Sequence, residues 1–547
     1  MNYEWLREVR KTTPRVREDS SYLNAMSTTG TRTRVEDVNP TSGMCPICIE
    51  ECPLLCEIGL SAFRGREVLY PKPEEFGTST ASSLKNYGLD WSDFNILSRL
   101  RGAEGIEEDP DKALFGNVDV SSEMGGVPIE IPVVTGAYGS TEVAKRNWDG
   151  LAIGAALSGV ILVIGENVCR MDPEAKFSEG SIEYSEDMEN RVETFREFWD
   201  GEHGDVAVQT NVEDERLDVE DYVINDLEVN IIERKWGQGA KAIGGEVRID
   251  SLERAQTLKD RGYIVFPDPE APSVKEGYRD GSITSFERHS RVGMPKKKNF
   301  IEDVEQLKEK GAKKVSLKTG AYRPSDVAWT MRVASQAEVD YLTFDGAGGG
   351  TGMSPVPMMN EMSTPTVYLE AQVLKCAKIL KENGKYVPDI SMAGGFTQET
   401  QILKSIALSN FDNEPFIESV TIGRSPITAA FKGKKFAEKA KEDSLPTNFK
   451  DKYGNKVEEF FITESELKEE YGKDYNKIPP SAIAVYTYIH DRIGVGLQQL
   501  LAGTRKWNLS LVNRNDLAAL TERASQVTEI PMIHERESDI YERMLLD

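Results

Sequence analysis

Four of the chain's six cysteines, Cys45, Cys48, Cys52 and Cys56, lie within twelve residues. A loop this short brings four thiolates together with little loss of loop-closure entropy, and it predicts a four-iron four-sulfur (4Fe-4S) cluster. Zinc is the alternative metal, although structural zinc sites usually combine two short pairs that a longer loop separates. A disulfide or an inert role is the third interpretation.

Three glycine-rich turns follow short apolar runs in the second half of the chain. They begin at Asp345-Gly346, at Gly394-Gly395 and at Gly423-Arg424. Turns without side chains expose backbone N–H groups, and an arginine adds a bidentate donor, so consecutive turns of this kind predict a phosphate-bearing cofactor. The alternative is that the glycines only permit tight turns.

A charged segment follows another apolar run and contains Glu233, Lys235, Gln238 and Lys241. Alternation along a strand places Glu233 and Lys235 on one face. Because a charged pair facing a layer of helices would be costly, the pattern favours a functional site at the end of this strand. The alternative is a charged pair at a solvated rim with a local structural role.

The apolar runs are short, β-branched and separated by helical stretches, which is typical of repeated strand–helix units. Eight of them predict an α/β fold, a (β/α)8 TIM barrel, with strands at residues 129–135, 159–165, 205–210, 227–232, 313–318, 340–345, 388–393 and 418–423. A ninth run ends at Phe266 before Pro267 and is predicted to belong to an insertion. Ser140 is expected to cap the first barrel helix.

Three domains are predicted. They are an N-terminal extension with the cluster loop over residues 1–94, the barrel over residues 95–431 and a C-terminal helical tail over residues 432–547. In such a barrel the glycine-rich turns end consecutive strands, and loops after the seventh and eighth strands commonly bind phosphate.

Composition narrows the possible partners and location. The formal net charge of -25 argues against nucleic acid or an anionic membrane as the main partner, because phosphate binding needs clustered cations. The first residues lack the apolar core of a secretion signal, and the longest apolar stretch, Leu151–Gly165, is too short to span a bilayer. With the thiols expected to be reduced, we predict a cytoplasmic enzyme, and we expect it to be an oligomer.

Several motifs together resemble the flavin domain of the glutamate synthases. Lys235–Lys241 resembles the family's KxxQGAK signature, and Asp345–Pro355 resembles its DGGxGGTGxSP loop. Three further stretches are similar to its first-strand turn, its NTGEGG turn and its SVKL strand, namely Val134–Ser140, Gly165–Asn167 and Val315–Lys318. The resemblance covers roughly residues 95–430, and Tyr486–Pro531 is similar to the family's C-terminal helices.

The resemblance implies a barrel that binds FMN and reduces an imine formed from 2-oxoglutarate and ammonia. Residues expected to bind the cofactor are Gly136 and Ala137 near the flavin, Lys318 at its pyrimidine edge, Asp345 and Gly346 in the following loop, and Gly394, Gly395, Gly423 and Arg424 at the phosphate. Residues expected to line the substrate side are Glu166, Lys235 and Gln238. Lys235 would bind a carboxylate of this small substrate, and Glu166 would transfer a proton.

The chain also departs from the family pattern. No glutaminase domain is expected ahead of the barrel, so ammonia would come from a separate subunit or from solution. The cysteine motif that usually follows the last strand is replaced by Arg424-Ser-Pro-Ile-Thr-Ala-Ala, the turn Gly239–Gly245 is shortened, and a PPPHHD stretch is not evident near His289. We expect the cysteine cluster at residues 45–56 to take over electron entry from a donor such as ferredoxin.

Three alternatives to glutamate synthesis remain at this point. One is a subunit that resembles methylglutamate synthase and transfers an amine other than ammonia. A second is a barrel that relays electrons within a larger redox complex. The third is a barrel that has lost its flavin and serves as a scaffold.

Overall fold

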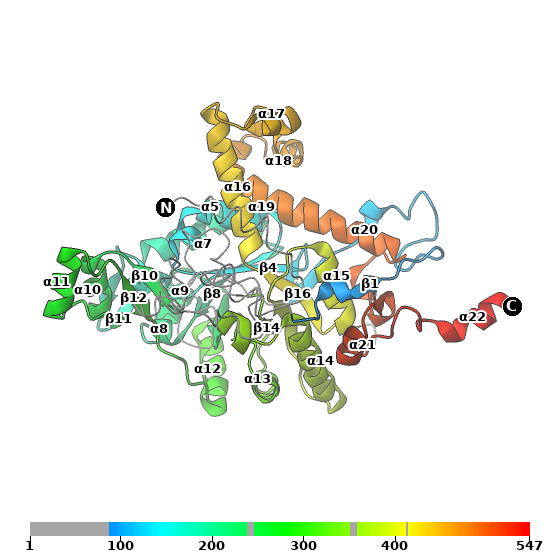
Figure 1. Cartoon of the computed structure of the whole chain (residues 1–547), viewed down its shortest axis with the longest axis horizontal. Coiled ribbons are helices and arrows are strands. Elements are labelled where there is room, and N and C mark those ends of the chain that lie inside the picture. The colour runs from blue at the N-terminus through cyan, green and yellow to red at the C-terminus, as the bar shows by residue number, and fades with distance from the viewer. Residues whose placement is uncertain (1–86, 238–245, 350–357, 412–413, 547) are drawn as a thin grey trace, which may run out of the picture.

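Eight parallel strands close into a barrel at the centre of the molecule (Figure 1). The computed structural model describes residues 87–237, 246–349, 358–411 and 414–546. The barrel strands are β4 (Val133–Tyr138), β5 (Ile161–Ile164), β8 (Val206–Thr210), β9 (Ile231–Lys235), β13 (Lys314–Gly320), β14 (Tyr341–Asp345), β15 (Asp389–Ala393) and β16 (Ile417–Ile422). The predicted α/β fold, a closed (β/α)8 barrel, is confirmed.

Neighbouring strands are hydrogen-bonded in the order β13-β14-β15-β16-β4-β5-β8-β9 around the barrel, so the last barrel strand, β16, pairs with the first, β4. The helices that follow successive strands are α5 (Trp148–Leu157), α7 (Glu186–Arg196), α9 (Val219–Asn225), α12 (Lys297–Lys310), α13 (Pro324–Ala337), α14 (Thr366–Glu382), α15 (Glu399–Ser409) and α16 (Arg424–Lys441). Each of the eight predicted strand ranges overlaps one barrel strand. The first lies later than predicted, because Val127–Ile129 form a separate strand, β3, that pairs with β2 (Ser122–Met124).

Side chains alternate along the barrel strands, pointing either to the helices or into the interior. The outer side is apolar, and the interior has an apolar part and a polar part. The side chains that face the helices belong to the main hydrophobic core. Near the amino ends of the strands, the interior is filled by a second apolar cluster that includes Ile161, Ile231 and Tyr341, with Met124 and Ile129 of the β2–β3 hairpin. Because the hairpin and this cluster fill the interior at the amino ends, the polar interior side chains lie nearer the carboxyl ends.

The first barrel helix begins one residue later than predicted. The hydroxyl of Thr141, not that of Ser140, accepts a hydrogen bond from the backbone N–H of Ala144 at 3.3 Å. Thr141 is therefore the N-cap of α4 (Glu142–Arg146), which precedes α5. Its hydroxyl lies three residues before the free N–H group, the spacing that an N-cap bond requires.

An antiparallel unit is inserted between β9 and α12, at one edge of the molecule in Figure 1. It contains β10 (Glu246–Ile249), α10 (Leu252–Asp260), β11 (Ile264–Phe266), α11 (Pro272–Asp280) and β12 (Phe286–His289). Its small core includes Leu258, Tyr263 and Phe286. The run that ends at Phe266 thus lies outside the barrel, as predicted.

The C-terminal part packs several helices against the barrel. Helix α16 continues through residue 431, and α17 (Thr447–Tyr453) and α18 (Glu464–Tyr471) form a projection beyond it (Figure 1). The chain returns through α19 (Pro480–Tyr486), the π-helical segment η8 (Thr487–Val495) and α20 (Gly496–Gly503). Strand β17 (Leu517–Ala519) pairs with β1 (Phe94–Ile96), and α21 (Glu522–Thr528) and α22 (Ser538–Leu546) follow. Within the described ranges, no helix has the length and hydropathy needed to cross a membrane.

Candidate functional site

A partly buried ion pair lies at the carboxyl ends of β5 and β9. Lys235, the last residue of β9, donates from Nζ to Oε1 of Glu166 at 2.7 Å. Glu166 lies in the turn after β5, and the two side chains are 18% and 13% exposed for Glu166 and Lys235. Burial opposes ionisation of Glu166, but the charge and hydrogen bond of Lys235 and the charge of Lys318 together lower its pKa. The carboxylate is therefore held in its charged form.

A second layer of polar side chains lies beside this pair inside the barrel. Gln209 donates from Nε2 to Oε1 of Glu233 at 2.5 Å, and both side chains are buried. The strand register places Gln209 opposite Glu233 and Lys318 opposite Lys235. Burial raises the pKa of Glu233, while the charge of Lys318 and the hydrogen bond from Gln209 oppose the rise. Two lysines and two carboxylates thus share the interior near the mouth of the barrel.

The glycine-rich turns after β14 and β15 lie against each other. The hydroxyl of Thr366 donates to the carbonyl of Gly394 at 2.6 Å. Gly394 has φ +114°, and a Cβ on it would lie 2.6 Å from the Thr366 hydroxyl oxygen. Arg424 then donates from Nη2 to the carbonyl of Gly348 at 2.9 Å. The structure therefore brings the three predicted turns together, and Gly394 leaves no room for a side chain in this packing.

The first strand meets the last at the same end of the barrel. The hydroxyl of Tyr138 donates to the carbonyl of Gly423 at 3.0 Å. Gly136 has φ +120°, and a Cβ there would lie 2.6 Å from the carbonyl oxygen of Val163, so only glycine fits. Ala137 follows and packs on the apolar cluster of the interior. Gly423 is the N-cap of α16, and no side chain caps this end of the helix. The N-terminus of a helix can bind an anion, although Pro426 in the first turn of α16 has no N–H to donate.

The residues at the barrel mouth fit a phosphate-bearing cofactor with a polar ring. Gln209 Oε1 and Thr343 Oγ1 are buried and have no hydrogen-bond partner among the described residues. Both belong to interior positions, where Thr343 is the register partner of Lys318. Buried polar atoms without partners are rare in folded proteins, and a bound polar group is one way to satisfy them. Lys318, which is 7% exposed, adds a cation for an anionic ring edge.

Part of the predicted site lies outside the described residues. Gln238, Lys241 and the rest of the turn after β9 fall there, as do residues 350–355 of the loop after β14. Cys45, Cys48, Cys52 and Cys56 fall there too, so the 4Fe-4S cluster stays a prediction. Asp345 and Gly346 are described at the end of β14, and Asp345 is 6% exposed.

Sequence reasoning missed Gln209 and Thr366. Gln209 could have been found from the strand pattern, because it occupies an inward position of β8 next to Glu233. Thr366 lies at the start of α14, far from any motif, and only the folded chain shows that it reaches Gly394.

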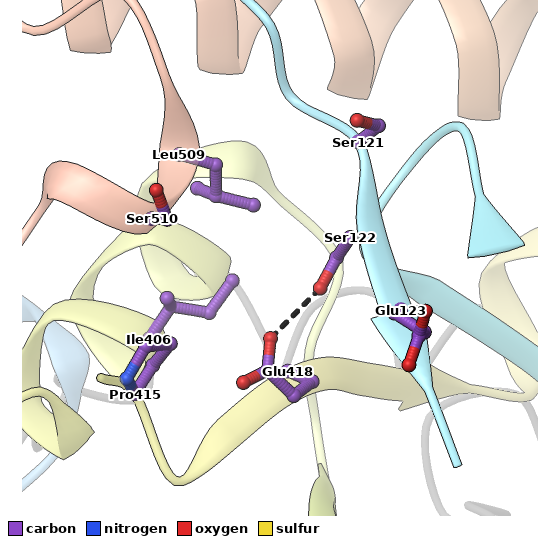
Figure 2. Close-up of a pocket in the computed structure, with 8 residues that line it drawn as sticks. All are labelled: Ser121, Ser122, Glu123, Ile406, Pro415, Glu418, Leu509 and Ser510. Carbon is purple, nitrogen blue, oxygen red and sulfur yellow. Dashed lines mark hydrogen bonds between the residues drawn. The ribbon is translucent and has the colours of Figure 1, made fainter. Parts of the chain in front are cut away.

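A cavity of about 210 Å³ lies at the opposite end of the barrel (Figure 2). Its lining consists of Ser121, Ser122, Glu123, Ile406, Pro415, Glu418, Leu509 and Ser510. Ser122 donates from its hydroxyl to Oε2 of Glu418 at 2.9 Å. Burial raises the pKa of Glu418 to about 7, and the charges of Asp389 and Glu123 add to the effect. Among the described residues that line this cavity there is no lysine or arginine, in contrast to the mouth with Lys235 and Lys318.

The strand pairing defines the molecule as a closed (β/α)8 barrel with a polar mouth. Residues 276–429 match the family model described as the conserved region in glutamate synthase, so the resemblance to this family is confirmed over that stretch. No curated protein sequence matches the chain.

Solved structures of other barrels show weak overall similarity. A flavocytochrome b2 double mutant with pyruvate bound has 11% sequence identity and a TM-score of 0.44, with 85% of each chain covered. A monotopic membrane protein, (S)-mandelate dehydrogenase, has 12% identity and a TM-score of 0.39, with 78% of this chain and 89% of that one covered. A putative lactate oxidase of Pediococcus acidilactici has 13% identity and a TM-score of 0.37, covering 76% and 81%. The fold assignment rests on the barrel's own strand pairing.

Proposed function

We propose that this protein is an FMN-dependent oxidoreductase of the glutamate synthase type, which reduces an imine formed from 2-oxoglutarate and ammonia. The observation that carries the proposal is the partly buried Glu166–Lys235 pair beside Lys318, at the barrel end where the glycine-rich turns converge. The family match over residues 276–429 supports it, because that stretch includes Lys318, Asp345, Gly394 and Arg424.

FMN would lie across the mouth of the barrel. Its phosphate would bind at Gly394, Gly395, Gly423 and Arg424, where backbone N–H groups and a guanidinium are available. Lys318 would lie near the pyrimidine edge, and Gly136 would let the backbone approach the ring. When bound, FMN supplies two-electron hydride chemistry that no side chain can perform.

The substrate would bind over Lys235 and Glu166. The Lys235 ammonium can pair with a substrate carboxylate, while the lowered pKa of Glu166 keeps this side chain ionised at neutral pH, in the form that can accept a proton. This base can take a proton from ammonium and so provide neutral ammonia for imine formation. It can return the proton to the nitrogen when the imine carbon receives the hydride. Gln238 would add an amide to the same pocket.

Electrons would enter through a 4Fe-4S cluster at Cys45, Cys48, Cys52 and Cys56 from a donor such as ferredoxin. Ammonia would be supplied by a separate protein or from solution. Iron and sulfide analysis of anaerobically prepared protein tests the cluster, and stoichiometric zinc without iron would refute it.

The deciding experiment for the substrate is a spectroscopic titration of the FMN-containing protein. We expect 2-oxoglutarate to perturb the flavin absorbance of the native protein, and Lys235→Ala to abolish that response while FMN stays bound. Lys314→Ala is the matched control, since Lys314 lies at the opposite end of β13 and pairs with Asp340. If neither 2-oxoglutarate nor glutamate alters the spectrum or exchanges electrons with the flavin, glutamate synthesis is the wrong assignment, and an amine-transferring or electron-relay role gains support.

A further inference from the structure

Asn167, the residue after Glu166, is held from two sides. Its backbone N–H donates to both carboxylate oxygens of Asp214, at 3.1 and 3.0 Å. Its side-chain oxygen accepts a hydrogen bond from the hydroxyl of Tyr263 at 2.6 Å. Asn167, Asp214 and Tyr263 are each less than 5% exposed. Because Asn167 adopts φ +67°, its left-handed conformation directs the chain immediately after Glu166.

Asp214, the first of the two residues that bond Asn167, belongs to the barrel. It lies in the short helix α8 (Val212–Glu215) after β8, and its carboxylate also accepts from the backbone N–H of Asn211 at 3.2 Å. That second bond completes a reciprocal cap of the helix. The position of the carboxylate is therefore fixed by the backbone of the helix that follows β8.

Tyr263, the second residue that bonds Asn167, belongs to the insertion between β9 and α12. Two guanidinium groups lie over its ring, Arg288 at 4.5 Å and Arg170 at 5.0 Å from the ring centre. Glu213, which is fully buried, accepts from Arg170 at 2.6 Å and from the backbone N–H of Arg291 at 2.7 Å. These contacts fasten the insertion to the segment that follows Glu166.

We propose that Asp214 and Tyr263 are positioning residues that hold Glu166 against Lys235 through Asn167. The insertion between β9 and α12 thereby controls the proton-transferring group at the barrel mouth. The consequence for catalysis rests on the proposed function, whereas the coupling between Tyr263 and Glu166 does not.

The charges around Glu166 show why its position matters. Lys235 of β9 and Lys318 of β13 attract the carboxylate, while Asp214 of α8 and Glu233 of β9 repel it. Burial raises the pKa of Asp214 to about 7, opposed by the N–H groups of Asn167 and Asn211. If Glu166 moved away from Lys235, it would lose its main attraction and keep the repulsion of its neighbours.

A double-mutant cycle on thermal unfolding tests the coupling without any substrate. Glu166→Gln is expected to lower the unfolding midpoint in the native background, and by about half as much or less in the Tyr263→Phe background. Tyr222→Phe is the matched control, because this buried hydroxyl contacts Ser185 and not Asn167. If Tyr263 only anchored the insertion, its effect would add to that of Glu166→Gln, as the effect of Tyr222→Phe should. Additive shifts in both cycles would overturn the proposal.

Asp214→Asn provides a second route to the same result. Its control is Asp172→Asn, another buried carboxylate that accepts from Ser185 at 2.7 Å and from the N–H of Asp187 at 3.0 Å. Coupling to Glu166→Gln is expected for Asp214 alone. Additivity of Asp214→Asn with Glu166→Gln would remove Asp214 from the proposal.

The pH dependence of the 2-oxoglutarate response tests the functional consequence. In Tyr263→Phe the acidic limb should move upward by roughly one pH unit, because a Glu166 that is displaced from Lys235 binds its proton more tightly. An unchanged pH profile in a protein that responds to 2-oxoglutarate would show that Tyr263 does not tune Glu166. If thermal coupling is present but the native protein shows no response to 2-oxoglutarate, the proposed function fails and the positioning contact stands.

Discussion

Partly buried carboxylates at the two ends of the barrel have pKa shifts of opposite sign. At the carboxyl ends of the strands, Glu166 is paired with Lys235 at 2.7 Å, and its pKa is lowered although burial opposes this. At the amino ends, Glu418 receives one hydroxyl hydrogen bond from Ser122, and burial raises its pKa to about 7 (Figure 2). The difference lies in the partner, because burial acts on both groups in the same direction.

The barrel mouth can bind an anion, whereas the cavity at the amino ends of the strands cannot. The mouth holds two cations, Lys235 and Lys318, which can attract an incoming carboxylate or phosphate. The desolvation cost of placing these cations there is already met in the folded protein. The cavity at the other end holds Glu418 near Asp389 and Glu123, so an anion would be repelled there. In barrels of this kind, function is concentrated at the carboxyl ends of the strands, and the opposite end serves stability.

Removing the cation should make Glu166 resemble Glu418. Lys235→Met leaves the partly buried carboxylate of Glu166 without this cation, and we expect the free energy of unfolding at pH 7 to fall by about 2–3 kcal/mol. Because the pKa of Glu166 is lowered in the native protein, its contribution is present above the unfolded pKa and is lost as the pH falls. The loss in Lys235→Met should therefore shrink towards pH 4, as urea unfolding at several pH values would show. A loss of similar size in Lys314→Met, which breaks a 3.7 Å contact to Asp340, would contradict this account.

Neutralising Glu418 should have the opposite sign. The pKa of Glu418 in the folded protein, about 7, lies above the ordinary value of 4.5, so the folded state keeps this proton to higher pH and stability declines as the pH rises between these values. We expect Glu418→Gln to raise the free energy of unfolding at pH 8 by about 2 kcal/mol and to have little effect at pH 4. Glu166→Gln should destabilise at pH 8. If both variants change stability in the same direction at that pH, the contrast between the two ends is wrong.

The sequence predicted the barrel because its strands leave a local pattern. Eight β-branched runs and the turns that end them are visible without tertiary contacts, and alternation alone placed Glu233 and Lys235 on one face. The cap at Thr141 instead of Ser140 shows the usual limit, since two neighbouring hydroxyls compete and only geometry decides between them.

Other features depend on residues far apart in the chain. The bond from Tyr263 to Asn167 joins an insertion to a turn 96 residues earlier, and no spacing rule connects them. The raised pKa of Glu418 arises from burial beneath the β2–β3 hairpin and from Asp389, which only folding brings near. Contacts of this kind become predictable only once the barrel register is known.

Alanine substitutions at two glycines, Gly395 in the mouth and Gly180 elsewhere, can distinguish the effect of backbone strain from the effect of lost cofactor binding. Gly395 and Gly180 have the same φ of +97°, and neither would bring a Cβ into a close contact. Gly395→Ala and Gly180→Ala should therefore each lower the free energy of unfolding by about 1 kcal/mol. Only Gly395→Ala should weaken FMN retention, measured by flavin release on dilution. Equal retention in both variants would move the phosphate away from this turn.

Ser122→Ala should give the smallest effect and act only on the Glu418 end. The hydroxyl of Ser122 stabilises the charged form of Glu418, so its loss should raise the pKa of that carboxyl further. The free energy of unfolding should then fall by about 0.5–1 kcal/mol at pH 8 and by less at pH 5, where Glu418 is protonated in the folded state. Ser121→Ala is the control, because its hydroxyl bonds Asp119 at 2.6 Å and makes no bond to Glu418. In a Glu418→Gln background the pH dependence of the Ser122→Ala effect should vanish, and its persistence there would show that another group at this end of the barrel titrates.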